Sequence, residues 1–162
     1  MDLDVAYVPT PKQIVNQMLH LTQLRRGEAL YDLGAGDGRI LIEAARRFGA
    51  KAVGIEIDPN RVSRIKERLK ATGVDAEVIH GNFMELDLSK ADVVTLYLSE
   101  SVNARLASKL DAELRAGTRI VSLDYPLPGW SVEKEIEAES GGVKRRIYLY
   151  VVSKSRISRP KS

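Results

Sequence analysis

The chain has 162 residues, the length of one folded domain. It contains no cysteine and only two histidines, His20 and His80, which excludes disulfides and leaves too few ligands for the usual metal sites, so we expect no metal. The net charge is +3, but residues 153–162 hold four basic residues and no acid, and subtracting these four charges leaves −1 on the remainder. The charge distribution therefore does not favour nucleic-acid binding.

The two ends of the chain suggest where the protein works. The first residues, Met1-Asp2-Leu3-Asp4, lack the basic start of a signal peptide, and no apolar run reaches the roughly 18 residues of a membrane span, so we expect a cytoplasmic protein without membrane contact. Residues 153–162 are expected to form a flexible basic tail, and the alternative is a docking arm for an acidic partner. The charged fraction of 29% is typical of a thermophile.

Strand-like and helix-like segments alternate along the chain. Apolar side chains at helical spacing predict a helix over residues 11–24, with Thr10 as its N-cap. The further expected elements are a strand at 29–33, a helix at 38–48, a strand at 51–57, a helix at 58–73 with Asp58 as N-cap, strands at 76–80 and 91–98, a helix at 99–114, a strand at 118–123, and a hairpin with arms 131–139 and 144–152.

This alternation predicts an α/β fold. We expect a Rossmann-like, doubly wound, mostly parallel seven-stranded sheet with helices on both faces and a C-terminal antiparallel hairpin. In such sheets, ligands bind outside the carboxyl ends of the strands, at the point where the strand order reverses. The turn after the first strand is therefore the expected binding site.

That turn reads Asp32-Leu33-Gly34-Ala35-Gly36-Asp37-Gly38. Its glycines allow positive φ angles and a close approach of a ligand to the backbone. The next expected strand carries Glu56, 20 residues after Gly36, a spacing at which an acid commonly accepts hydrogen bonds from ribose hydroxyls. The segment thus indicates a cofactor that contains a nucleoside.

Two features of the turn distinguish the candidate cofactors. A dinucleotide site needs the spacing G-x-G-x-x-G, whereas the third glycine here, Gly38, comes one residue early. The carboxylates of Asp32 and Asp37 would repel a pyrophosphate, but they suit the ammonium and sulfonium groups of S-adenosylmethionine, with Asp32 acting on the methionine amino group. The alternatives are NAD binding and a turn that only joins strand to helix.

The same segments resemble known motifs. Residues 32–38 resemble the first motif of class I, seven-strand S-adenosylmethionine-dependent methyltransferases, Gly54-Ile55-Glu56-Ile57-Asp58 looks like the second, and Gly81-Asn82-Phe83 looks like the third, which commonly contacts adenine. Segments from Tyr7-Val8-Pro9-Thr10-Pro11 to Gly129-Trp130 resemble the small archaeal protein lysine methyltransferases. That group is similar to mitochondrial lysine methyltransferases and to the non-SET histone lysine methyltransferases.

The resemblance implies one methyltransferase domain over residues 1–152, in which residues 1–24 form an arm and a helix over the cofactor site. Asn82 and Phe83 are then expected at the adenine, with a turn residue and a core ring as the alternative. The arm before the first helix is expected at the methionine end, with a helix cap as the alternative. The residues expected to bind S-adenosylmethionine are Tyr7, Pro9, Thr10, Asp32, Gly34, Ala35, Gly36, Asp37, Gly38, Glu56, Ile57, Asn82, Phe83 and Tyr97.

The ends of the fourth and fifth strands supply candidates for catalysis. Leu96-Tyr97-Leu98-Ser99 stands where many methyltransferases carry Asn/Asp-Pro-Pro-Tyr/Phe to hold a planar nitrogen, and the Tyr97 ring suits an aliphatic amine instead. Asp124 is placed to receive the substrate ammonium, although Leu123-Asp124-Tyr125 departs from the His-Glu/Asp-Phe pattern of the family. Tyr97, Tyr7 and Asp124 are the expected catalytic residues. Strand-end packing and turn capping are the alternatives for Tyr97 and Asp124.

The resemblance implies a protein lysine N-methyltransferase of broad specificity, which transfers methyl groups to exposed lysines by in-line displacement. The implied partners are protein substrates, including small chromatin proteins, with no metal and no obligatory nucleic acid, and we expect a monomer. The alternatives are an RNA or small-molecule methyltransferase and a noncatalytic binding subunit with the cofactor fold.

Overall fold

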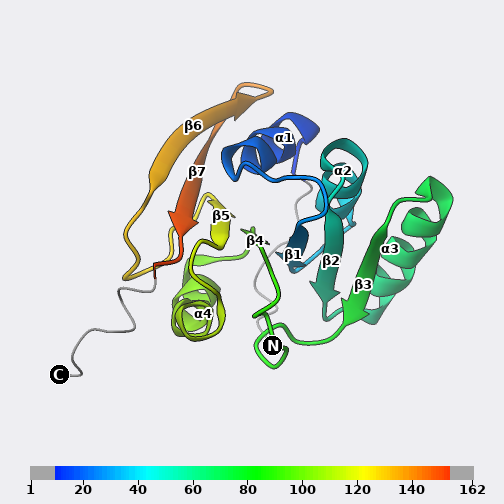
Figure 1. The fold of residues 1–162 in the computed structure, drawn as a ribbon. Helices are drawn as coiled ribbons and strands as arrows, with labels where there is room; N and C mark the ends of the chain where they lie inside the picture. The colour runs from blue at the N-terminus through cyan, green and yellow to red at the C-terminus, as the bar shows by residue number, and fades with distance from the viewer. Residues whose placement is uncertain (1–9, 154–162) are drawn as a thin grey trace.

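The computed structural model describes residues 10–153 of the chain. In chain order, these residues form α1 (Lys12–Leu21), β1 (Ala29–Leu33), α2 (Arg39–Phe48), β2 (Lys51–Glu56), α3 (Pro59–Thr72), β3 (Ala76–His80), β4 (Val93–Leu96), α4 (Glu100–Glu113), β5 (Arg119–Leu123), β6 (Lys134–Ser140) and β7 (Val143–Val151) (Figure 1). The succession of strands and helices follows the sequence prediction. The expected arm, residues 1–9, and most of the expected tail, residues 154–162, lie outside the described residues.

The strands form one sheet in the order β3-β2-β1-β4-β5-β7-β6. The first five strands in this order run parallel, while β7 is antiparallel to both β5 and β6. The predicted fold class is therefore confirmed. The strand order reverses between β1 and β4, so the carboxyl ends of these two strands mark the place where sheets of this kind bind ligands.

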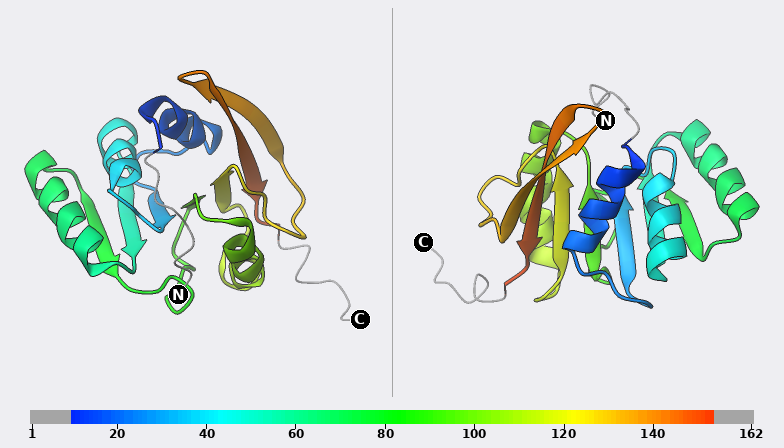
Figure 2. Two further views of the ribbon diagram at one scale, coloured as in Figure 1. Left: turned by 180° about the vertical axis from the view of Figure 1, so that it is seen from behind. Right: turned by 90° about the horizontal axis from the view of Figure 1, so that it is seen from above.

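Helices cover both faces of this sheet. α1, α2 and α3 lie on one face and α4 lies on the other (Figure 2). Leu41 of α2 and Ile65 of α3 are buried in a hydrophobic cluster with β1, β2 and β3, whereas Leu106 of α4 is buried in a second cluster with β4, β5 and β7. Ile14 of α1 packs with Ile147 of β7, so α1 lies between α2 and the hairpin (Figure 1).

Local hydrogen bonds decide where the helices begin. Asp58 caps α3 as predicted, because its Oδ1 accepts from the N–H groups of Asn60 and Arg61. The prediction that Thr10 caps α1 is wrong. Pro11 has an extended backbone with ψ of 146° and occupies the N-cap position, so the helix begins one residue later than a Thr10 cap requires.

The neighbours of each strand decide where it ends. β4 stops at Leu96 instead of residue 98, because its neighbour β1 ends at Leu33, the partner of Leu96. Tyr97 and Leu98 therefore extend past the carboxyl edge of the sheet. In the hairpin, Ser140 pairs with Val143 across a two-residue glycine turn, so the arms are 134–140 and 143–151 rather than the predicted ones.

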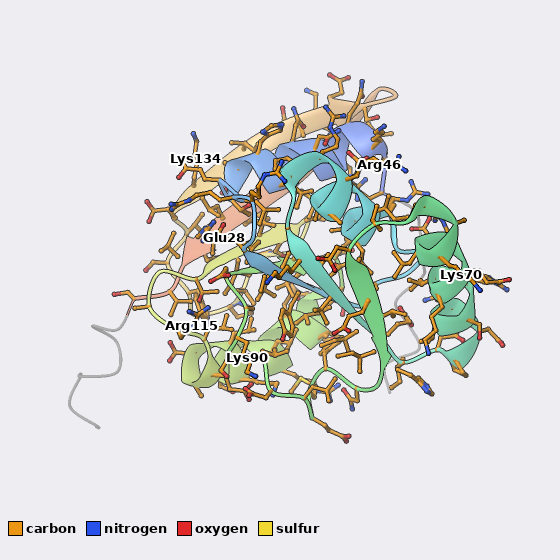
Figure 3. All side chains as sticks on the ribbon, turned by 45° about the vertical axis from the view of Figure 1, so that its right-hand side comes forward. Glu28, Arg46, Lys70, Lys90, Arg115 and Lys134 are labelled. Carbon is orange, nitrogen blue, oxygen red and sulfur yellow. The ribbon has the colours of Figure 1, made fainter. Side chains whose placement is uncertain are left out.

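Charged side chains surround the opposite edge of the sheet. Figure 3 labels Glu28, Lys90 and Arg115, which precede β1, β4 and β5 in the chain. Arg115 donates hydrogen bonds to the carbonyl oxygens of Ser89 and Ala91 and pairs with Asp92 at 2.9 Å. Within residues 10–153, each helix is too short or too polar to cross a lipid bilayer.

The close packing of β2 against the glycine turn gives a stability prediction. A Cβ added to Gly54 would lie 2.6 Å from Leu41 Cδ1 and 2.8 Å from Ala35 Cβ, and the second atom has no side-chain freedom to move away. We expect Gly54→Ala to lower the free energy of unfolding by about 1–3 kcal/mol, the usual cost of overpacking a core. Urea denaturation of the variant and the parent protein measures this change.

Gly81→Ala is the matched control for this substitution. Its added Cβ would meet Leu86 Cδ1 at 3.4 Å, which is ordinary van der Waals contact. Because replacing glycine by alanine where the backbone permits it also restricts the unfolded chain, the control should keep or slightly raise stability. Equal losses in both variants would contradict the packing argument.

Candidate active site

The glycine turn after β1 is fastened to the end of β2. The N–H groups of Gly34 and Ala35 both donate to the carbonyl oxygen of Ile55, at 2.8 and 3.1 Å. Gly34 has a φ of +79° and is exposed, and a Cβ there would lie 3.0 Å from Leu98 Cδ2. The turn thus presents bare backbone beside the residues that follow β4, which suits close contact with a ligand.

Asp32 is the buried acid of this turn, with 2% of its surface exposed. Its Oδ1 accepts a hydrogen bond of 2.8 Å from the Thr95 hydroxyl, because the two residues are cross-strand partners in β1 and β4. Burial raises the pKa of Asp32 to about 7, the Thr95 hydrogen bond opposes that rise, and the nearby carboxylates of Glu56 and Asp37 add to it. A positive ligand would remove the cost of ionising this carboxyl.

Thr95 is a site residue that the sequence analysis missed. It is fully buried, and it is the one polar residue in the strand Val93-Val94-Thr95-Leu96. A lone hydroxyl in an apolar strand was the available signal. Its meaning depends on the register that sets Thr95 opposite Asp32, which the sequence does not state.

Glu56 joins the turn to the segment that follows β2. Its Oε1 accepts from the Gly36 N–H at 2.9 Å and its Oε2 accepts from the Asp58 N–H at 3.1 Å. A carboxylate has about four acceptor positions, so further ones remain for hydroxyl donors. The geometry is compatible with the predicted ribose contact, which stays a prediction, as does the role of Ile57, the next residue.

Asp37 has arginine partners. Arg39 donates to both of its carboxylate oxygens, at distances of 2.7–3.2 Å, and Arg68 Nη1 lies 3.4 Å from Oδ2 and donates to the backbone carbonyl of Asp37. Arg39 also donates to the carbonyl oxygen of Thr10 at 2.7 Å. Through Arg68, Asp37 connects the turn to α3, and through Arg39 it connects the turn to Thr10, just before α1. These contacts account for the position of Asp37, and its predicted role beside a cationic cofactor stays a prediction.

The residues expected at the adenine follow β3. Asn82 Oδ1 accepts from the Met84 N–H at 2.9 Å, which leaves the side-chain amino group as the donor for a predicted adenine contact. Phe83 is half-buried and packs against the hydrophobic cluster under α4. Both residues thus combine a structural contact with the predicted one.

Tyr97 and Asp124 meet through a residue that the sequence analysis did not single out. Arg145 of β7 donates to both Asp124 oxygens, at 2.7–3.1 Å, and its guanidinium carbon lies 5.3 Å from the centre of the Tyr97 ring. The hydrogen bond to Asp124 raises the pKa of Arg145, so the guanidinium stays charged. The Asp124 carboxylate, predicted to receive a substrate ammonium, is already paired with this arginine.

Most of the predicted residues gather at one edge of the sheet. Asp32 and the glycines, Glu56, Asn82, Tyr97 and Asp124 follow or close β1, β2, β3, β4 and β5, whose carboxyl ends share that edge. Tyr7 and Pro9 lie outside the described residues. In residues 10–153, no group of three histidine, aspartate or glutamate side chains is arranged to hold a metal ion.

The family model described as the ANTKMT methyltransferase domain matches residues 32–134. This range includes the described site residues from Asp32 to Asp124, but not Arg145 of β7. The chain belongs to this methyltransferase family.

Relatives of this methyltransferase extend the match. It is 41% identical to a protein-lysine N-methyltransferase of Saccharolobus islandicus over 155 residues, which cover 94% of this chain and 96% of that protein. It is 36% identical to the mouse adenine nucleotide translocase lysine N-methyltransferase over 131 residues, but spans only 56% of that longer protein. Resemblance to archaeal and mitochondrial lysine methyltransferases, predicted from the sequence, is confirmed.

A solved structure gives a match over the whole fold. The structure described as an RNA methyltransferase from Salinibacter ruber in complex with S-adenosyl-L-homocysteine superposes with a TM-score of 0.85 and 40% identity, covering 96% of this chain and 98% of that one. The cofactor of this methyltransferase is S-adenosylmethionine. The residues at the site fit this cofactor, because the carboxylates of Asp32 and Glu56 and the exposed backbone of Gly34 suit a cationic nucleoside. The positively charged Arg39 and Arg68 are paired with Asp37.

Proposed function

We propose that this enzyme methylates lysine ε-amino groups of protein substrates. The observation that carries the proposal is the 41% identity, over nearly the full length of both chains, to a protein-lysine N-methyltransferase. The end of β4 supports it, because Leu96-Tyr97-Leu98-Ser99 offers an aromatic side chain and no Asn/Asp-Pro-Pro pair to hold a planar nitrogen.

In this proposal, the chain binds and orients the two reactants. Asp32 pairs with the methionine ammonium, Glu56 accepts from the ribose hydroxyls, and Asn82 and Phe83 contact the adenine. Bound S-adenosylmethionine supplies a methyl group on a positively charged sulfur that leaves readily. The contribution of the protein is then mainly positioning, which is worth several kcal/mol when the reacting atoms are well aligned.

The acceptor lysine has to lose its proton before it can attack. Its ordinary pKa is about 10.4, and surroundings that exclude water lower the pKa of an ammonium. Tyr97 is half-buried and packs against the hydrophobic cluster that includes Ile14 and Ile147. In the proposal, its ring forms an apolar wall for the aliphatic part of the lysine side chain. Tyr7 would complete the site from the arm.

We propose broad specificity for the same enzyme. All the strands of residues 10–153 lie in one sheet, and the helices of this part pack on that sheet, so it carries no separate substrate-binding domain. Exposed lysines of several proteins, small chromatin proteins among them, are the proposed substrates, and the proposed form is a cytoplasmic monomer.

RNA methylation is the second candidate function. It is favoured by one observation, that the structural relative from Salinibacter ruber is described as an RNA methyltransferase at 40% identity. The strand-end sequence speaks against base nitrogens as acceptors, for the reason given above.

One labelling experiment separates the two functions. The purified enzyme is incubated with S-adenosylmethionine carrying a labelled methyl group and with cell lysate, and the label is then challenged with protease or with nuclease. We expect protease to release the label, and mass spectrometry to place it on lysine. Label that resists protease and is released by nuclease would refute lysine methylation and support the RNA function.

A further inference from the structure

We infer that Arg145 is a positioning residue of the methyl-transfer site: it holds Tyr97 and neutralises Asp124, so that the acceptor lysine enters as the uncharged amine. The inference rests on the proposed function, which places that lysine beside Tyr97. Arg145 lies on β7, far along the chain from the cofactor motifs.

The contacts of Arg145 join two strand ends. Its Nε and Nη2 donate to both oxygens of Asp124, which follows β5, and its guanidinium lies over the ring of Tyr97, which follows β4. The side chains of Arg145 and Asp124 are only 14% and 26% exposed. A paired fork of this kind fixes a carboxylate in both distance and direction, and a planar guanidinium also packs well on an aromatic face.

The neighbouring arginine shows that this pairing is particular to Arg145. Arg146 pairs with Glu135 at 2.7 Å, but these side chains are 54% and 39% exposed. Successive residues of a strand point to opposite faces, so Arg145 shares the face of the buried Ile147, toward α1, while Arg146 points away. The two residues form a natural comparison within one strand.

The backbone of Asp124 is strained in the conformation that serves this pair. Its φ is +68°, in the left-handed region that residues other than glycine rarely adopt. The Tyr125 N–H donates to the Leu123 carbonyl around it, and the Asp124 N–H donates to the Arg146 carbonyl at 2.7 Å. Strain of this kind persists where the surroundings impose it, and it is common at active sites.

Neutralising Asp124 matters for the chemistry. A free carboxylate beside the acceptor would stabilise the lysine ammonium and raise its pKa, which reduces the fraction of uncharged amine. Because both Asp124 oxygens accept hydrogen bonds from Arg145, the Asp124–Arg145 pair has no net charge. In the proposed site, the acceptor lysine lies near this neutral pair and beside the Tyr97 ring. Asp124 thus acts through Arg145 instead of binding the substrate ammonium.

Most other charges on the packed elements have partners of their own or point to the other face of the sheet. These groups are Lys12 and His20 on α1, Arg119 on β5, Lys134, Glu135, Glu137 and Glu139 on β6, and Lys144 and Arg146 on β7. Lys12 pairs with Glu43, and Arg119 pairs with Glu28. Ala138 is the β6 partner of Arg145, so Glu137 and Glu139 on either side of it point to the other face. His20 is exposed and makes an edge-to-face contact with Phe48.

The test compares pH–rate profiles of methyl transfer to a protein in which mass spectrometry has found methyl-lysine. In Arg145→Gln we expect kcat to fall about 10- to 100-fold, and the rising limb of the profile to move up by about one pH unit because Asp124 is left unpaired. The affinity for S-adenosylmethionine, measured by calorimetry, should stay within about twofold of the parent value, since Arg145 touches no predicted cofactor residue except Tyr97.

Three further variants make the test decisive. The double variant Arg145→Gln with Asp124→Asn should return the profile to its original pH, because it removes both charges. Arg145→Lys keeps the charge without the fork, and should keep the profile position at a reduced kcat; it also decides the matter if Arg145→Gln does not fold. Arg146→Gln, the matched control, should leave both quantities unchanged.

Each outcome has one meaning. A pH–rate profile that does not move in Arg145→Gln, or that moves equally in Arg146→Gln or Arg145→Lys, would overturn the inference about Arg145. The proposed function would still hold in that case, provided that the parent reaction produces methyl-lysine. Absence of methyl-lysine from the parent reaction would overturn both. A shifted profile that the double variant restores would establish the role of Arg145.

Discussion

Asp32→Asn is expected to weaken S-adenosylmethionine binding by roughly 10- to 100-fold, as measured by calorimetry at pH 8. The substitution keeps the shape of the side chain and an oxygen that accepts from Thr95, but it removes the negative charge. Asp32 is buried, so little water is present to replace a lost ion pair with the ligand. Asp75→Asn, at an exposed carboxylate before β3, is the control and should bind normally.

Asp32→Asn should also remove a pH dependence of the free energy of unfolding. The pKa of Asp32 is raised to about 7 in the folded protein from an ordinary value of 3.8, so the folded state binds more protons than the unfolded state between these pH values. The free energy of unfolding of the ligand-free enzyme should therefore fall as pH rises from about 4 to about 7. Above pH 7, Asp32→Asn should be the more stable protein.

Cofactor affinity should follow the opposite course. A cationic ligand favours the ionised carboxyl, so affinity in the parent protein should rise as pH approaches about 7 and then level off. The variant should show no such rise. An affinity that is equally strong in Asp32→Asn, or equally dependent on pH, would refute the assignment of Asp32 to the ligand.

Glu56→Gln is expected to lower both cofactor affinity and stability. Each Glu56 oxygen accepts from a backbone N–H, of Gly36 or of Asp58, so an amide nitrogen in place of either oxygen would set a donor against a donor. An unsatisfied buried group costs about 1–3 kcal/mol. The glycine turn would also lose a hydrogen bond that holds it in place, and this turn includes the expected ligand contacts. Thermal unfolding and calorimetry measure the two losses.

The neighbouring strand offers a control for Glu56. Glu77→Gln changes an exposed side chain of β3 and should leave stability and affinity unchanged. If Glu56→Gln kept full affinity despite reduced stability, its role would be confined to fastening the turn, and the ribose contact would be wrong.

Local signals explain why the fold could be predicted from the sequence. Apolar periodicity and the glycines after β1 and α2 depend on nearby residues alone, so the strand–helix succession and the position of the turn were visible without a structure. Glu56 was visible for a similar reason, because a βα unit places the end of its second strand beside its first turn.

Contacts across the sheet explain what the sequence could not show. Thr95 matters because the register sets it opposite Asp32, and Arg145 matters because β7 lies beside β5 and not at the edge. Lys144-Arg145-Arg146 reads as a solvated charged stretch of a hairpin arm. Only the strand order reveals that one of these side chains turns inward to Asp124 while the next stays in water.

The order β5-β7-β6 has a consequence for synthesis on the ribosome. β7 is made last, yet it occupies an interior place between two strands that are already finished. Until β7 emerges, β5 pairs only with β4, and Asp124 lacks its partner Arg145. A nascent chain can therefore build its glycine turn early, but the pairing of Asp124 with Arg145 has to wait until β7 has left the exit tunnel.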